Sequence, residues 1–205
     1  MNKTKLILLS VILLITSTHL LSQKNEDMNF KTATFGTGCF WCSEAIFSRL
    51  DGVIKVEPGF SGGTTKNPSY KEVVTGTTGH AEVAQISYNP EIISFSTLLE
   101  VFWKTHDPTT LNRQGADIGT QYRSVIFYHD KEQESLATDY KSALEEAKVW
   151  NDPIVTEITR FDIFYPAEDY HNDYYKNNPA NSYCNFVITP KIEKFEKVFK
   201  DKLKK

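Results

Sequence analysis

The stretch KTATFGTGCFWCSEAIFSRL, residues 31–50, contains the transition that decides the fold. Residues 31–35 form a short β-type run, which Gly36-Thr37-Gly38 interrupts. From Cys39 to Leu50 the apolar side chains return at near-helical spacing. The stretch therefore predicts a strand, a tight glycine turn and a helix, in that order.

The rest of the chain continues this alternation. We expect strands at 53–56, 81–88, 122–128 and 155–159, helices at 94–104 and 131–148, and loops at 57–67 and 105–121. The order β-α-β, β-α-β with a further helix and strand predicts the α+β class, as an elaborated split βαβ (ferredoxin-like) two-layer sandwich with helices on one face of a mixed sheet. Residues 191–205 predict a docked amphipathic helix with a solvated basic face.

Composition indicates an ordinary globular protein: the chain has 205 residues, of which 40% are hydrophobic and 24% are charged. We expect a single domain over residues 23–205 and a monomer. The formal net charge of −3 argues against nucleic-acid binding, which needs a clustered excess of Lys and Arg.

The N-terminus predicts an export signal. Lys3 and Lys5 precede an apolar run, Leu6–Ile15, that is too short to span a bilayer with comfort. We expect a signal peptide over residues 1–22, with retention as a short N-terminal membrane anchor as the alternative, because Leu20 fits the small-residue rule for cleavage poorly. The protein is then periplasmic or secreted, where disulfides persist.

Three cysteines are an odd count, which directs attention to reactive sulfur. Cys39 follows a glycine turn at a helix N-terminus, where the helix dipole lowers a thiol pKa, so Cys39 is the candidate nucleophile. Cys42 shares its helical face and could pair with it as a dithiol. Phe40 and Trp41 could line an apolar slot for a methyl or thioether group.

Further polar side chains are candidates for the same site. Glu82 begins a strand after a glycine turn, where a carboxyl can be desolvated and held protonated as a general acid. Tyr70 and Tyr122 could donate phenolic hydrogen bonds, and Asp117 lies in the long loop.

Three blocks of sequence carry a family resemblance. GCFWC (38–42), GHAEV (79–83) and NRQGADIGTQYRS (112–124) resemble the signature motifs of the A-type peptide methionine sulfoxide reductases, and the likeness runs from about residue 31 to 195. It implies a peptide-methionine (S)-S-oxide reductase, which reduces methionine S-sulfoxide, free or in proteins, and so repairs oxidised proteins under oxidative stress. The family's fold is also an elaborated α+β sandwich.

The resemblance also implies roles for the candidates. Cys39 attacks the sulfoxide sulfur, Glu82 protonates the sulfoxide oxygen, Tyr70 and Tyr122 hydrogen-bond that oxygen, and Asp117 belongs to the polar network around it. The aromatic walls for the substrate's methyl group match Phe40 and Trp41, and the C-terminal resolving cysteine matches Cys184.

The residues support this sulfoxide chemistry independently of the family resemblance. A low-pKa cysteine, an acid and hydroxyl donors around one apolar slot suffice for thiolate attack on a protonated sulfoxide. The cysteine is left as a sulfenic acid, which condenses with a second thiol to a disulfide that a thioredoxin-type dithiol reduces. We expect no metal, flavin or nicotinamide.

Two positions depart from the family pattern. Cys42 stands where glycine is commonest, and His171-Asn172 stands where many members have His-Gln. We expect Cys184 to be the main resolving thiol, because a polar, turn-rich stretch precedes it, and Cys42 to be a weakly reactive hydrophobe. Cys42 stays the alternative resolving thiol.

Three other functions stay open from the residues alone. A thioredoxin-like oxidoreductase would use Cys39 and Cys42 only, and Glu82 and the tyrosines would have no chemical role. An acyl-transfer enzyme could be built from Cys39, His80 and Asp117. A secreted binding module would have a disulfide as its only chemistry.

Overall fold

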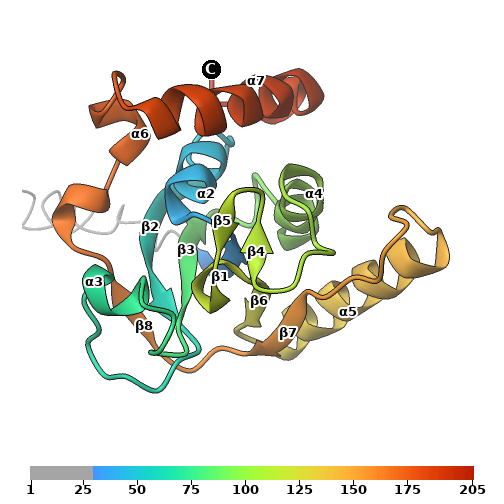
Figure 1. The fold of residues 1–205 in the computed structure, drawn as a ribbon. Coiled ribbons are helices and arrows are strands. Elements are labelled where there is room, and N and C mark those ends of the chain that lie inside the picture. Colours follow the sequence, from blue (N-terminus) through green and yellow to red (C-terminus); the bar gives the residue numbers. More distant parts are fainter. Residues whose placement is uncertain (1–29) are drawn as a thin grey trace, which may run out of the picture.

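Strand β1 (Lys31–Thr37) lies inside a six-stranded sheet of order β7-β6-β1-β3-β2-β8. The computed structural model describes residues 30–205 (Figure 1). All neighbouring strands are antiparallel except β6 and β7, which are parallel, so the sheet is mixed. The remaining strands of this sheet are β2 (Val53–Ser61), β3 (Ala81–Tyr88), β6 (Ser124–Tyr128), β7 (Glu157–Arg160) and β8 (Phe164–Pro166).

Helices connect and cover these strands. They are α2 (Phe40–Phe47), α3 (Tyr70–Val73), α4 (Phe95–Thr105), α5 (Lys131–Glu146), α6 (Tyr174–Asn177) and α7 (Thr189–Val198). A small hairpin of β4 (Arg113–Gln114) and β5 (Asp117–Ile118) stands apart from the main sheet. Short 3-10 turns occur at Thr120–Tyr122, Asp169–His171 and Lys200–Lys202, and one π-helical turn, Cys184–Ile188, leads into α7.

The two faces of the sheet are covered differently. Side chains of a strand alternate between faces, so Ala84 and Ile86 of β3 enter the main core with α2, α4, α5 and α7, whereas Ala81 and Val83 point to the opposite face. There they meet β6 and the aromatic rings of Phe161 and Phe164. The helices therefore cover one face, and the segment around β7 and β8 covers the other.

Phe35 is at the centre of the main core. Its ring is fully buried, and its centroid lies 5.6 Å from that of Phe47, 5.8 Å from that of Phe95 and 5.2 Å from that of Phe102. These rings come from α2 and α4, so one side chain of β1 holds both helices against the sheet.

The structure and the expected elements agree in class and differ in detail. The mixed-sheet α+β class is confirmed, while the ferredoxin-like designation stays a prediction. The loop expected at 57–67 is wrong over its first part, because β2 continues to Ser61 between β3 and β8. Gly59 makes this pairing possible: a Cβ there would lie 2.4 Å from the ring of Phe164.

Two further differences follow from pairing. The strand expected at 122–128 begins at Ser124, because Thr120–Tyr122 is a 3-10 turn. The expected 105–121 loop contains the β4–β5 hairpin. The predicted signal peptide or anchor at 1–22 lies outside the described residues. Within residues 30–205, no helix has the length and apolar character that crossing a membrane requires.

Phe35→Ala tests the central role of this ring. We expect it to lower the free energy of unfolding by about 3–5 kcal/mol, because it removes a fully buried ring and leaves a cavity among three others. Urea denaturation followed by circular dichroism measures the change. Phe30→Ala, at a side chain that is 59% exposed, is the matched control and should change stability by less than about 0.5 kcal/mol. Equal effects of the two substitutions would contradict the assignment.

Candidate active site

Cys39 caps the N-terminus of α2 directly after β1. It has φ −58° and ψ 124°, and its carbonyl accepts hydrogen bonds from the backbone N–H groups of Cys42 at 3.1 Å and Ser43 at 3.4 Å. Gly38 makes the turn with φ +92°, and a Cβ at that position would lie 2.6 Å from the Cβ atom of Gln114. A glycine is therefore needed at this turn both for its backbone angle and for space.

Glu82 of β3 lies against the same helix end. Its carboxylate oxygen Oε2 accepts a hydrogen bond of 3.1 Å from the backbone N–H of Phe40, and its side chain is only 1% exposed. Burial raises the pKa of Glu82 to about 8; the Phe40 N–H opposes this rise, and the charge of Asp117 adds to it. At neutral pH the group is a protonated acid next to Cys39.

Three tyrosines and Asp117 complete the polar side of the site. Burial, followed by the charge of Glu82, raises the pKa values of Tyr70 and Tyr122 well above their ordinary range, so both keep their hydroxyl protons. The Tyr183 hydroxyl donates a hydrogen bond of 2.6 Å to Asp117 Oδ2. Glu82, Asp117, Tyr70 and Tyr122 thus gather at one place, as the sequence predicted.

Tyr183 is a site residue that the sequence analysis missed. The Tyr183 hydroxyl lies beside the sulfurs of Cys39 and Cys42 as well as beside Asp117. Burial, together with charge on the two cysteines, therefore raises the pKa of Tyr183. The available signal was its position directly before Cys184, but no spacing rule connects residue 183 with residue 39.

The ionisation of Cys39 differs from the expectation. Its side chain is 7% exposed, and burial raises its pKa well above the ordinary value, with the hydrogen bond to Cys42 next in importance. Desolvation therefore outweighs the helix dipole, and the predicted low pKa belongs to Cys42, where the hydrogen bond with Cys39 lowers the pKa to about 7. Within this hydrogen-bonded pair, the thiolate form is therefore favoured at Cys42 over Cys39.

Aromatic side chains form the apolar side of the site. The Phe40 ring is 1% exposed and stacks near Tyr70, with centroids 6.1 Å apart. Trp41 stacks face to face on Tyr174, with centroids 3.6 Å apart and planes 4° apart. Phe40 and Trp41 therefore place aromatic rings around the first turn of α2, and their role as walls for a methyl group stays a prediction.

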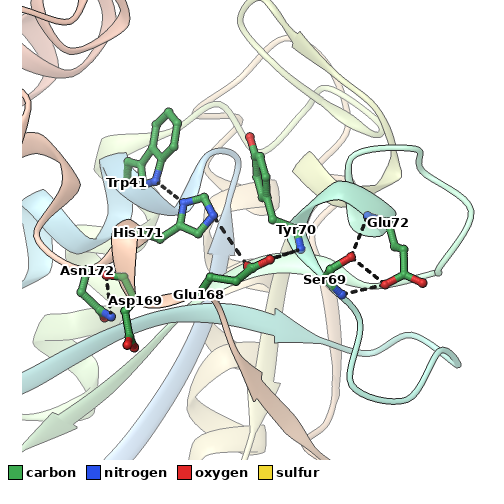
Figure 2. A network of polar contacts seen from close by, with 8 residues as sticks. All are labelled: Trp41, Ser69, Tyr70, Glu72, Glu168, Asp169, His171 and Asn172. Atoms are coloured by element: carbon green, nitrogen blue, oxygen red, sulfur yellow. Dashed lines mark hydrogen bonds and ion pairs between the residues drawn. The ribbon is translucent and has the colours of Figure 1, made fainter.

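A polar network fixes two of these aromatic groups (Figure 2). Trp41 Nε1 donates a hydrogen bond of 3.0 Å to His171 Nδ1, and the other ring nitrogen of His171 lies 3.8 Å from Glu168 Oε2. Glu168 also accepts a hydrogen bond of 3.0 Å from the backbone N–H of Tyr70. Asn172, the departure from the family pattern, is exposed and bonds to the Asp169 carbonyl, so it does not contact Trp41 through this network.

His80 is placed away from catalysis. Its Nδ1 accepts a hydrogen bond of 3.0 Å from the Gly63 N–H, and its Nε2 donates to the Thr65 carbonyl at 2.7 Å. Because both ring nitrogens hold the 63–65 loop, His80 is not free to act as the base of a Cys-His-Asp enzyme. Within residues 30–205, no cluster of three or more His, Cys, Asp or Glu side chains is arranged to hold a metal ion.

Cys184 and Cys42 are both unpaired thiols in the described part of the chain. Cys184 begins the π-helical turn before α7, is fully buried and belongs to the same core as Cys39. The polar, turn-rich stretch before Cys184 therefore ends at a packed helix. Cys42 is 2% exposed, and its Sγ lies 3.9 Å from Lys191 Nζ. Lys191 is half-buried, so the predicted solvated basic face is wrong at this residue.

Comparison with known proteins decides the family. The model of the peptide methionine sulfoxide reductase family matches residues 31–203. The chain belongs to this family. It is 53% identical over 174 residues to the peptide methionine sulfoxide reductase MsrA of Saccharolobus solfataricus, covering 85% of this chain and 97% of the relative. The MsrA of Leptospira borgpetersenii is 50% identical over 165 residues, covering 80% and 93%.

Solved structures agree. The reduced form of Mxr1 from Saccharomyces cerevisiae superposes with a TM-score of 0.70 at 35% identity, covering 78% of this chain and 92% of the other. Methionine sulfoxide reductase A of Corynebacterium diphtheriae gives 0.68 at 34% identity, covering 77% and 78%. The protein is thus an oxidoreductase of the MsrA type, a family that reduces methionine sulfoxide, and the resemblance found in the sequence is confirmed.

Glu82→Gln tests the protonation of the buried acid through stability. Between pH 4.5, the ordinary Glu pKa, and about 8, the unfolded chain releases the Glu82 proton while the folded chain retains it. The wild type therefore loses stability as pH rises through this window, and a glutamine removes the loss. We expect the variant's stability relative to wild type to increase on the order of 1 kcal/mol per pH unit.

Urea denaturation at pH 5, 6, 7 and 8 measures this difference. Burial also raises the pKa of Glu44 to about 7, but Glu44 titrates in both proteins, so its contribution cancels in the difference. The exposed Glu193→Gln is the matched control and should show a flat difference. A flat difference for Glu82→Gln as well would show that Glu82 is ionised throughout.

Proposed function

We propose that this enzyme reduces the S epimer of methionine sulfoxide, free or in proteins, to methionine through a sulfenic acid on Cys39, and so repairs oxidised proteins. The observation that carries the proposal is the buried Glu82 carboxyl, which accepts a hydrogen bond from the Phe40 N–H at the helix end that Cys39 caps, beside the aromatic side chains of the first turn of α2. A sulfoxide bound there would place its oxygen on Glu82, Tyr70 and Tyr122 and its methyl group against Phe40 and Trp41.

The first step is attack of the Cys39 sulfur on the sulfoxide sulfur. Cys39 gives up its proton to the thiolate of Cys42, its hydrogen-bond partner, as its sulfur attacks. Glu82 protonates the sulfoxide oxygen, and the tyrosine hydroxyls stabilise the charge that develops on it. The hydroxyl then moves from the methionine sulfur to the Cys39 sulfur as the bond between the two sulfurs breaks, so methionine leaves and Cys39 becomes a sulfenic acid.

The second step restores the enzyme. A second thiol, Cys184 or Cys42, displaces the sulfenic oxygen and forms a disulfide with Cys39, and an external dithiol of the thioredoxin type reduces that disulfide by exchange. The structural relative Mxr1 has also been crystallised in complex with Trx2, which supports a reductant of this class. The roles described need no metal, flavin or nicotinamide.

Export is a separate part of the proposal. It rests on the sequence of residues 1–22 alone, and N-terminal sequencing of the protein from separated cell fractions distinguishes a cleaved signal from a retained anchor.

Cys39→Ser and Glu82→Gln test the chemical roles. Cys39→Ser should abolish reduction of a methionine sulfoxide peptide, because a hydroxyl does not supply the nucleophile. Glu82→Gln should keep substrate affinity and lose roughly 10²–10⁴-fold in the rate of a single turnover, the usual contribution of a general acid. Chromatography of the reduced peptide measures the rate for both variants. Glu193→Gln is the control. An unchanged rate with weaker binding would make Glu82 a binding residue.

Resolved epimers test the geometry of the pocket. With the oxygen held by Glu82 and the tyrosines, and the methyl group held by Phe40 and Trp41, only one configuration at sulfur presents the S–O antibonding orbital to Cys39. We expect the S sulfoxide of a peptide to be consumed and the R sulfoxide to remain. Equal rates for the two epimers would be incompatible with this arrangement.

A further inference from the structure

Cys42 has an electrostatic partner that comes from the far end of the chain. Lys191, in the first turn of α7, directs its ammonium group at Cys42 Sγ with an N–S distance of 3.9 Å. The sulfur is 2% exposed and the lysine is half-buried, so little water screens the contact. Helix α7 packs against α2, which holds the lysine and the cysteine together (Figure 1).

Cys184 has no comparable activation. It is fully buried in the turn that leads into α7, and burial raises its pKa, with the charge of Cys42 adding to the rise. The pKa of Cys42 is lowered instead. The hydrogen bond with Cys39 lowers it most, burial acts against this, and the positive charge of Lys191 lowers it further. Of the two thiols that could resolve Cys39, one is favoured as an anion and the other as a neutral thiol.

We propose that Lys191 is a positioning residue that makes Cys42 the first thiol to attack the sulfenic acid on Cys39. The proposal rests on the proposed function, because it assumes that a sulfenic acid forms there. It reverses the expectation from the sequence, which placed the main resolving role on Cys184.

The step balances as follows. Cys42 first releases to solvent the proton that it took from Cys39. As a thiolate it then supplies the electron pair of a new S–S bond to Cys39, and the S–O bond of the sulfenic acid breaks. The oxygen leaves as hydroxide and takes a proton from solvent to become water. The Cys39 sulfur is reduced and the Cys42 sulfur is oxidised, so no further oxidant or reductant takes part until the external dithiol reduces the disulfide.

A single turnover without reductant tests the proposal. The reduced full-length protein receives one equivalent of a methionine S-sulfoxide peptide, and samples are quenched with an alkylating reagent at increasing times. The reduced, methionine-containing peptide reports the first step, and loss of free thiols reports the second. Peptide mapping identifies the first disulfide. In wild type we expect Cys39–Cys42, and in Cys184→Ser the same bridge should still form.

Lys191→Met should release one methionine per enzyme but lose thiols roughly fivefold more slowly, because a smaller fraction of Cys42 is thiolate near neutral pH. The sulfenic acid then accumulates and should be trapped by dimedone. Lys191→Arg keeps the charge and should restore most of the rate. Lys197→Met, an exposed lysine of the same helix, is the control for net charge and should behave as wild type.

The pH dependence of thiol loss separates an electrostatic from a structural role. In wild type the rate should rise with pH as Cys42 ionises, and in Lys191→Met the midpoint of this rise should move to higher pH. The titratable groups that face this sulfur or its lysine are, besides Lys191, Cys39, Glu82, His106, Asp117, Tyr183 and Cys184. All of them are retained in the variant, so a movement of the midpoint reports the lysine.

Two results would overturn the inference. One is Cys39–Cys184 as the first disulfide in wild type; the other is thiol loss in Lys191→Met at the wild-type rate and midpoint. Failure of wild type to release methionine would instead overturn the proposed function, and this inference with it. Should Lys191→Met fold poorly, its methionine amplitude falls below one per enzyme, and Lys191→Gln takes its place.

Discussion

The hydrogen bond from the Phe40 N–H to the Glu82 carboxyl is the contact on which the active site depends. It joins the first turn of α2 to the middle of the sheet, and it brings an acid and a thiol together in one buried site. Two buried acidic groups at such close range do not both ionise without a large electrostatic cost. The site therefore favours the protonated form of Glu82 and the thiolate form of Cys42. Reduction of a sulfoxide needs this same division, a proton for oxygen and an electron pair on sulfur.

Around this contact, the site has two halves of different origin. The strand-turn-helix at residues 31–47 and strand β3 supply the groups to which we assign the chemistry. The region from Glu168 to Lys191 supplies what holds them: His171 orients Trp41, Tyr174 covers its face, and Tyr183 connects the sulfurs with Asp117. The chemistry is therefore encoded early in the sequence, and its positioning late.

This division explains what the sequence could predict. Local patterns were sufficient for the glycine turn before Cys39, for β3 and for the helices after residues 94 and 131, since each depends on neighbouring residues. The motifs also located Glu82, Tyr122 and Asp117, and the family resemblance added Tyr70. Contacts between distant segments were missed: β2 extends past Pro58 because β8 pairs with it, and Tyr183 and Lys191 acquire their partners only when α7 packs on α2. The low pKa predicted for Cys39 was wrong for a related reason. A local sequence pattern indicates a helix N-terminus, but it does not indicate the burial that raises the pKa of the thiol.

The stacking of Trp41 on Tyr174 has a consequence for the order in which the protein is made. Synthesis runs from the N-terminus, so Cys39, Phe40 and Trp41 leave the ribosome long before the residues that cover them. A chain that has not yet reached Tyr174 carries its indole ring without the facing phenol, and one that has not reached Lys191 carries Cys42 without its cation. The contacts around these sulfurs can therefore form completely only when nearly the whole chain has been made.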